Sequence, residues 1–368
     1  MNYYREKNIC HCFACGVNAD IFELIGWDYN TSDFNEQFKI GCDLFGLDIG
    51  QTSHTRARIK PVRKYDKTKN EDERAPLEVR HNVYTAMKDI FGLRSVNEKH
   101  LSEVRHLTEK RIKTDYFWMP KEWPKGTINK IMKLASCSPD MLKKVPGFYQ
   151  DGAGNLTHRK ESGIAILIRD VDGKAQGIQI RRDTAEKGNR YVWFSSRFAK
   201  GGTSPGAAKD VVIPRRPKKI LCVTEGRFKA ESLAQKGNIT ISLQGVANWK
   251  NIDQVIQKLR EKYTLHTIYL MFDADVMGNI QIMKTLQKMT EYLHQTLPDM
   301  QVKTGVWKIE SGKGIDDFFY SGVLQQNHNI KYLDAGEFYQ KCLNSIEPVQ
   351  KALGLRSLKH LTEERERS

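Results

Sequence analysis

The chain has 368 residues, a length sufficient for two or three domains with their own hydrophobic cores. Its 59 Lys and Arg outnumber its 44 Asp and Glu, and the net charge of +15 favours a polyanionic partner, nucleic acid rather than membrane. Without an apolar run of about 18 residues or a secretory signal, we expect no membrane contact and a cytoplasmic location. The alternative is that the surplus lysine serves solubility alone.

The amino-terminal stretch holds three of the seven cysteines. Cys12 and Cys15 have the spacing of a zinc knuckle, because two thiolates separated by two residues reach one tetrahedral ion. Either the chain is truncated at its start, or Cys10 or His11 completes the zinc site together with a distant ligand such as Cys42. The alternative is that this segment is the relic of a zinc ribbon and binds no metal. The odd cysteine count argues against a disulfide framework.

Helical patterns and a charged segment follow. Apolar residues on helical spacing predict a helix within 33–49. Charged residues with little to bury predict a mobile linker over 51–79. Four more helices are predicted at 80–91, 102–110, 126–135 and 138–144. They form a small helical subdomain with no candidate catalytic residue.

Residues 145–215 are rich in β-forming residues and in arginine. The Asp-Gly pair at 172–173, between two apolar runs, predicts a β-hairpin. Arg181 and Arg182 end its second strand, and Arg190 opens another strand. We predict that these arginines bind nucleic-acid or nucleotide phosphates, because guanidinium groups pair with phosphate oxygens. The alternative is an ordinary solvated sheet face.

Residues 216–325 alternate between strand and helix patterns. Strands are predicted at 220–223, 239–243, 266–272 and 302–307, and helices at 227–236, 251–262 and after Gly278. This order predicts an α/β fold with a four-stranded parallel sheet, right-handed crossovers and flanking helices.

Carboxylates stand where two of these strands end. Glu225 follows the first strand, and Asp273 and Asp275 follow the third. Ligands of open parallel sheets bind outside the carboxyl ends of the strands, so we expect these acids on one rim. Such a cluster repels itself unless a cation joins it, and its oxygen ligands suit Mg²⁺ or Mn²⁺. The site is predicted to perform phosphate chemistry. The alternative is that the acids only cap the following helices.

Several of these motifs carry a family resemblance. The segment around the acids resembles the Toprim domain of DnaG-type primases, topoisomerases and some nucleases. The resemblance rests on the Glu-Gly at 225–226, the Asp-x-Asp at 273–275 and Gly278. The cysteine knuckle is similar to the second half of the zinc ribbon in those primases. The arginine-rich block resembles the basic lobe that precedes their Toprim domain.

The chain departs from the replicative primases at two positions near the acids. Lys229 stands where they carry Asp, and Gly314 stands at the first acid of their Asp-Pro-Asp pattern. Asp316 falls on the second acid. With the Lys-Gly-Ile-Asp-Asp at 313–317, these features resemble the primase-like proteins of phages, plasmids and integrative elements more than the chromosomal enzyme.

The resemblance implies a primase that makes RNA primers on single-stranded DNA from nucleoside triphosphates, a nucleotidyltransferase in mobile-element replication. It implies that Asp273 and Asp275 hold divalent ions with Asp316 assisting, that Glu225 is a general base or a metal contact, and that Lys229 binds phosphate. A replicative helicase is a further candidate partner. The alternatives are a Toprim nuclease and a catalytically inactive DNA-binding replication accessory.

The domain organisation expected from these patterns has six parts. They are a partial zinc-ribbon module at 1–50, a charged linker at 51–79, a helical subdomain at 80–144, a basic α+β lobe at 145–215, a Toprim catalytic domain at 216–325 and a helical tail at 326–368.

Overall fold

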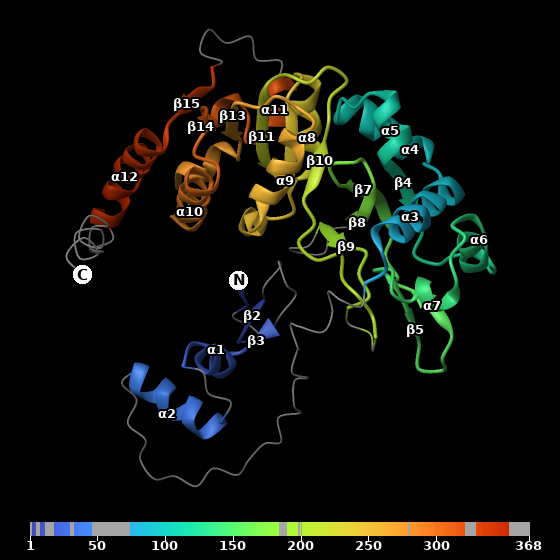
Figure 1. The fold of residues 1–368 in the computed structure, drawn as a ribbon. Helices are drawn as coiled ribbons and strands as arrows, with labels where there is room; N and C mark the ends of the chain where they lie inside the picture. The colour runs from blue at the N-terminus through green and yellow to red at the C-terminus, as the bar shows by residue number, and fades with distance from the viewer. Residues whose placement is uncertain are drawn as a thin grey trace. The chain divides into compact units, whose positions relative to one another are not determined.

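The computed structural model divides the chain into two compact units, Met1–Asp72 and Glu73–Ser368 (Figure 1). It describes residues 2–4, 8–11, 18–29, 33–45, 74–183, 190–197, 199, 201–278, 280–320 and 329–352. Cys12, Cys15 and most of the predicted linker lie outside the described residues, so the hypotheses about them stay predictions.

The Met1–Asp72 unit combines a small antiparallel sheet with two helices. Its elements are β1 (Asn2–Tyr4), β2 (Ile9–His11), β3 (Asn18–Ala19), α1 (Ile21–Asp28) and α2 (Phe34–Phe45), with the sheet order β1-β2-β3. Asp20 caps α1, since its Oδ1 accepts from the Glu23 N–H at 2.8 Å while Glu23 Oε2 accepts from the Asp20 N–H at 3.0 Å. The α2 helix confirms a helix within 33–49. Cys10 lies in β2 and the buried Cys42 in α2.

The Glu73–Ser368 unit begins with short helices and an antiparallel sheet. The helices are α3 (Leu77–Phe91), α4 (Ser95–Lys99), the π-helix η2 (His100–Val104), α5 (Glu109–Asp115), α6 (Thr127–Leu134) and α7 (Pro139–Leu142). The four-stranded sheet has the order β4 (Tyr116–Met119), β7 (Gly163–Arg169), β8 (Ala175–Arg182) and β9 (Tyr191–Trp193), and β5 (Phe148–Gln150) pairs with β6 (Leu156–His158). Gly173, with a φ of 78°, lies in the turn between β7 and β8, which confirms the predicted hairpin.

The single helix predicted over 102–110 is wrong. The chain leaves the helical conformation after Val104, and His106 takes a left-handed φ of 53°. A new helix, α5, begins after Thr108, whose Oγ1 accepts a hydrogen bond from the Arg111 N–H at 3.4 Å. An N-cap starts a helix rather than continuing one, so the threonine divides the periodic segment in two.

A six-stranded mixed sheet forms the centre of the second unit. Its order is β10 (Asp210–Val212), β12 (Ile239–Leu243), β11 (Ile220–Glu225), β13 (Thr267–Leu270), β14 (Gln301–Val306) and β15 (Lys331–Leu333). The inner four strands are parallel, as predicted. The two edge strands are antiparallel and were not predicted, because three residues are too few to show a periodic pattern.

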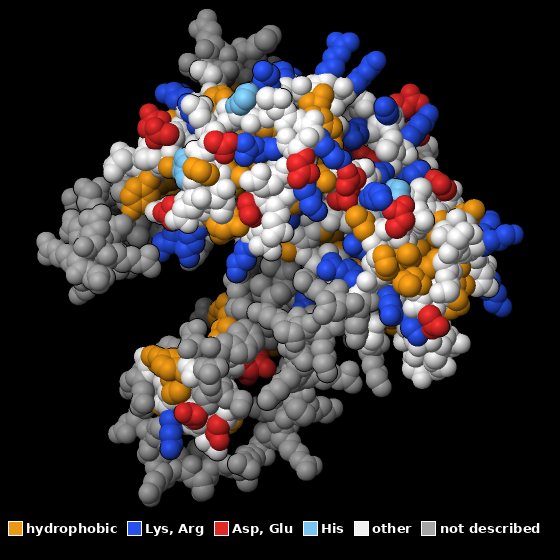
Figure 2. Space-filling view, viewed as in Figure 1, with side chains coloured by type: hydrophobic (Ala, Val, Ile, Leu, Met, Phe, Trp, Pro, Cys, Tyr) orange, Lys and Arg blue, Asp and Glu red, His pale blue; other side chains and the backbone are white. Residues whose placement is uncertain are grey.

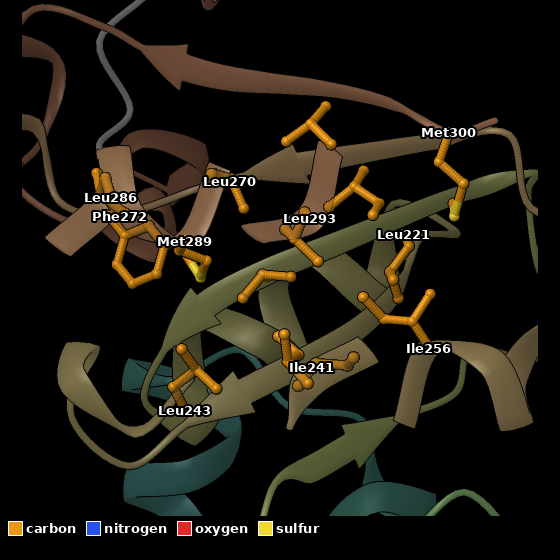
Figure 3. Close-up of a cluster of buried hydrophobic side chains, with 14 of the residues drawn as sticks. Leu221, Ile241, Leu243, Ile256, Leu270, Phe272, Leu286, Met289, Leu293 and Met300 are labelled. Atoms are coloured by element: carbon orange, nitrogen blue, oxygen red, sulfur yellow. The ribbon is translucent and has the colours of Figure 1, made fainter. Parts of the chain in front are cut away.

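Helices cover both faces of this sheet. They are α8 (Arg227–Gln235), α9 (Ile252–Arg260), α10 (Ile280–Thr296), α11 (Ile315–Tyr320) and α12 (Ala335–Ala352). The buried side chains of β11, β12 and β13 pack against α9 and α10 in the cluster of Figure 3. On the opposite face, Cys222 and Met271 pack with Leu233 of α8 and Phe318 of α11. Because both faces are covered, the strand ends are the part of this sheet that remains open to a ligand. No helix in the described part of the chain is both long and apolar enough to cross a membrane.

His158 is a buried histidine whose protonation should destabilise the second unit. The residue is 3% exposed, its ring centroid lies 3.6 Å from that of Trp123, and its Nδ1 lies 2.9 Å from the Arg159 carbonyl oxygen. Burial lowers its pKa to about 4 from the ordinary value of 6.5. The unfolded chain therefore takes up the proton first, and stability is lost as the pH falls from 6.5 to about 4.

We expect this one group to remove on the order of 3 kcal/mol of stability across that pH window. The measurement is urea unfolding at pH 7, 5.5 and 4 for the wild type and His158→Phe, a variant that keeps an aromatic ring against Trp123. The variant should show a shallower loss of unfolding free energy with acid. Equal pH dependence in the two proteins would contradict the assignment.

Candidate functional site

Three acids lie at the carboxyl ends of two neighbouring strands. Glu225 is the last residue of β11, and Asp273 and Asp275 follow β13, which pairs in parallel with β11. Burial raises the pKa of Glu225, and the charges of Asp273 and Asp275 raise it further. The Lys229 and Lys313 ammonium groups oppose this rise. The structure therefore brings Asp273 and Asp275 close enough to Glu225 to influence the ionisation of that group.

Asp316 joins the same region from α11. Burial, followed by the charge of Asp317, raises its pKa, while the charges of Lys229 and Arg105 lower it. We call the four carboxylates of Glu225, Asp273, Asp275 and Asp316 the acidic rim. Gly314 precedes Asp316 and donates its N–H to Asp317 Oδ2 at 3.1 Å.

Each aspartate of the acidic rim has a basic partner within the chain. The pairs are Lys229 Nζ with Asp273 Oδ1, Lys313 Nζ with Asp275 Oδ2 at 2.7 Å, and Arg105 Nη1 with Asp316 Oδ2 at 3.3 Å. The sequence had predicted acids gathered directly around a shared divalent ion. In the structure the acids are gathered around ammonium and guanidinium groups instead.

The fit of a divalent ion to the rim depends on donors and on their arrangement. The donors suit Mg²⁺ or Mn²⁺, since all are carboxylate oxygens, and the buried Asp316 Oδ1 has no hydrogen-bond partner among the described residues. The arrangement of these donors does not match a metal site. Within the described ranges, no three His, Cys, Asp or Glu side chains are grouped so that they could hold an ion. The oxygen donors of the rim therefore suit such an ion by type, while among the described residues they do not converge on one ion site and Lys229 occupies Asp273.

Basic side chains collect beside the acidic rim. We call His100, Arg105, Arg181 and Arg190 the basic cluster. Burial is the main cause of the lowered pKa of His100, and the charges of Arg181, Arg105 and Arg190 lower it further, so these three guanidinium groups act on the His100 ring. Arg105 also contacts Asp316 and so connects the basic cluster to the acidic rim.

The basic cluster contains buried side-chain nitrogen atoms without a hydrogen-bond partner. His100 Nε2, Arg105 Nε and Arg181 Nε are all buried and have no hydrogen-bond partner within the part of the chain that the structure describes. Buried polar atoms are normally paired, so unpaired guanidinium nitrogens on two neighbouring arginines are unusual. The two guanidinium groups, those of Arg105 and Arg181, are cationic donors and suit an anion such as a phosphate group. Over the face in Figure 2, by contrast, Lys and Arg alternate with Asp and Glu, so net charge alone does not locate a site.

Arg182, the third predicted arginine of this block, points elsewhere. Its guanidinium donates to Glu161 Oε2 at 2.8 Å and Oε1 at 2.7 Å. Consecutive residues of a strand face opposite sides of the sheet, so Arg181 and Arg182 do not share a site. Strand alternation alone predicts this separation.

Arg105 was missed because it lies in the segment 102–110, which was predicted to be an ordinary helix, and His100 was not singled out in the sequence. His100 opens η2, and Arg105 follows it. Such π-helical turns are frequent at functional sites, but no pattern of residues announces one. The link from Arg105 to Asp316 spans 211 positions and is visible only in the folded chain.

A buried charge network holds the first turn of α8 beside Glu225. Arg227 donates to Asp115 Oδ2 at 2.5 Å, to both oxygens of Asp210 at 3.0 Å, to Glu231 Oε1 at 2.8 Å and to the Leu167 carbonyl at 3.1 Å. Asp115 also pairs with Arg169 and Arg111. Although burial alone would raise the pKa of Asp115, the three guanidinium groups hold it below its usual value. The network joins α8 to the six-stranded sheet through Asp210 of β10 and to the four-stranded sheet through Leu167 of β7.

Comparison with known proteins places this architecture in one structural class. Residues 212–325 match a family model described as a domain of unknown function, DUF3854. No curated protein matches the chain. The mixed α/β fold is that of bacterial primase catalytic domains.

Three solved structures illustrate the likeness. The Aquifex aeolicus primase, with its zinc-binding and RNA polymerase domains, is 17% identical at a TM-score of 0.50, over 94% of this chain and 80% of that one. A DnaG primase catalytic domain bound to ssDNA is 14% identical at 0.50, over 75% and 91%. The E. coli primase catalytic core is 14% identical at 0.50, over 74% and 83%. This chain therefore has the fold of a DnaG-type primase core.

Proposed function

We propose that this chain is a primase-like nucleotidyltransferase that joins ribonucleotides on single-stranded DNA, in the replication of a mobile element. The observation that carries the proposal is the junction at Arg105, where a basic cluster with unpaired buried nitrogen atoms meets the acidic rim in a primase fold. A similar solved structure, by its title, has single-stranded DNA bound, which supports the choice of template.

The residues of the chain divide the work of phosphoryl transfer. Arg105, Arg181 and His100 bind the phosphates of template or nucleotide and orient them toward the rim. A divalent ion, when bound by the aspartates of the rim, would stabilise negative charge on the attacking and leaving oxygens. Glu225, whose carboxyl group holds a proton more readily than usual because it is buried, accepts the proton of the attacking hydroxyl at its carboxylate.

The deciding experiment follows the length of a labelled nucleic acid. The full chain is incubated with single-stranded DNA, the four nucleoside triphosphates and MgCl₂ or MnCl₂. Labelled RNA that grows with time supports the primase. Shortening of labelled DNA indicates instead a nuclease that uses the same rim.

A second candidate is a DNA-binding replication accessory without catalysis. The observation that favours it is the pairing of every rim aspartate with a basic side chain of the chain itself. This candidate predicts tight DNA binding with no change in the length of either nucleic acid.

We also propose that the amino-terminal unit holds zinc through Cys12 and Cys15 with Cys10 or His11. Two thiolates at this spacing reach one tetrahedral ion. Cys10 and His11 both lie in β2, directly before the knuckle.

Arg181→Met should weaken binding of single-stranded DNA. We expect a loss of roughly tenfold in affinity, since a hydrogen bond to a charged group contributes about 1.5–3 kcal/mol. The slope of log K against log salt should fall by about 0.7, because one phosphate contact is lost. Fluorescence anisotropy of a labelled oligonucleotide at several salt concentrations measures both.

Arg182→Met is the matched control for this prediction. Arg182 is adjacent in sequence and has the same charge, but it pairs with Glu161. This variant should bind single-stranded DNA with an affinity within about twofold of wild type, because salt screens the charge of an arginine that does not contact the DNA. Equal losses for the two variants would mean that net charge, and not the basic cluster, binds the DNA.

A further inference from the structure

Lys229 lies where the carboxylates of three different elements meet. It is the third residue of α8, its side chain is 21% exposed, and its ammonium group contacts Asp273 Oδ1. Burial has the largest influence on the pKa of Glu225, and the charge of Lys229 has the second largest. The charge of Lys229 also opposes the rise in the pKa of Asp316. One ammonium group thus faces the end of β11, the loop after β13 and the start of α11.

Gly314 provides the space for this lysine. A Cβ atom at position 314 would lie 3.0 Å from Lys229 Cε and would overlap Asp316 Oδ1. A side chain there would require the lysine and the carboxylate to move apart. The two positions at which the sequence departs from the replicative-primase pattern are therefore in contact, and the glycine makes room for the lysine.

We infer that Lys229 is a built-in counter-ion of the acidic rim, and that it competes with divalent cations for Asp273. A fixed ammonium group compensates the carboxylates in the folded chain, so the rim does not require an ion to offset its charge. A divalent ion binds only by displacing Lys229 from Asp273, and this lowers the affinity of the rim. The inference rests on the proposed function only in taking the rim as the reaction site.

The test measures binding of Mn²⁺ by the full chain, without nucleotide or template. Free Mn²⁺ is followed by electron paramagnetic resonance during titration of the wild type and of Lys229→Met, which keeps the length of the side chain and removes its charge. We expect Lys229→Met to bind Mn²⁺ about tenfold more tightly. Lys229→Arg, which keeps the charge, should remain close to wild type. Binding by the amino-terminal cysteines is common to all variants and cancels in the comparison.

The matched control is Lys236→Met, at the end of the same helix. The Lys236 ammonium group lies over the Phe319 ring, 4.8 Å from its centroid, and no rim carboxylate pairs with it in the described residues. This variant should leave the Mn²⁺ affinity unchanged. If Lys229→Met unfolds, Lys229→Gln removes the same charge while keeping a hydrogen-bond donor for Asp273, and the same tightening is expected.

The inference is overturned if neutral variants at 229 bind Mn²⁺ no more tightly than wild type, or if Lys229→Arg tightens binding as much as Lys229→Met. The readout needs no turnover and is therefore separate from the proposed function. A wild type that makes no primers, together with tighter Mn²⁺ binding by Lys229→Met, would reject the primase and leave the counter-ion in place. Primer synthesis by the wild type, together with unchanged Mn²⁺ binding by Lys229→Met, would support the primase and reject the counter-ion.

Discussion

Asp273→Asn is expected to reduce primer synthesis by on the order of 10³-fold, with little change in affinity for single-stranded DNA. A rim that stabilises the transferring phosphate contributes several kcal/mol, and about 1.4 kcal/mol corresponds to each factor of ten in rate. Asp273 is the rim acid in contact with Lys229, and it follows the strand adjacent to that of Glu225. The basic cluster, which we expect to bind DNA, is left intact. Labelled-primer assays and anisotropy with the same oligonucleotide measure the two effects.

Asp299→Asn is the control for this substitution. Asp299 also pairs with a basic residue, Arg260, but it is 59% exposed and lies outside the rim. Asp299→Asn should leave the rate of primer synthesis within about twofold of wild type. An exposed ion pair contributes at most about 1 kcal/mol to stability, and this one lies away from the reaction site. If Asp273→Asn retains the wild-type rate of synthesis, the rim is not catalytic. If wild type and variant both bind DNA without making primers, the accessory role is the better description.

Arg227→Met is expected to lower the free energy of unfolding by about 3–5 kcal/mol, the range for breaking a buried ion pair on one side. The Arg227 side chain is 1% exposed and pairs with three carboxylates, those of Asp115, Asp210 and Glu231. Removing the guanidinium leaves these acids buried and under-compensated. Urea unfolding at pH 7 measures the loss, and acid should reduce it, because burial already raises the pKa of Asp210 and Glu231 and protonation relieves the repulsion.

Arg260→Met is the matched control for Arg227→Met. Arg260 forms its ion pair with Asp299 near the surface, and its side chain is 28% exposed. A loss of about 0–1 kcal/mol is expected. Similar losses for the two variants would show that the buried network contributes no more than a surface pair. A large loss for Arg227→Met alone would also connect stability to the site, because Arg227 begins the helix that carries Lys229.

The central sheet was predictable because its signals are local. Each inner strand is a short apolar run that ends at turn residues, and each following helix has its own apolar period. The rule that ligands bind at the carboxyl ends of parallel strands then places Glu225 and Asp273 side by side. The edge strands and the break at Thr108 were not predicted, since a three-residue strand and a single cap leave no periodic trace.

The chemical environment of the acids was not predictable in the same way. Lys229 was identified as an unusual residue, but its contact with Asp273 depends on how α8 packs beside the loop after β13. Arg105 showed no functional signal, and its role depends on a contact with Asp316. Such contacts join residues far apart in the chain, and side-chain charges that decide a pKa act over distances that sequence spacing does not encode.

By itself, the sequence determined the parallel sheet, the hairpin and the positions of the acids at strand ends, because hydrophobic periodicity and turn chemistry are written in neighbouring residues. Only the tertiary structure decided which cation each acid meets, which of two adjacent arginines faces the site, and that Arg227 lies among three buried carboxylates. These outcomes depend on the packing of separate elements, which brings charges together regardless of their distance along the chain.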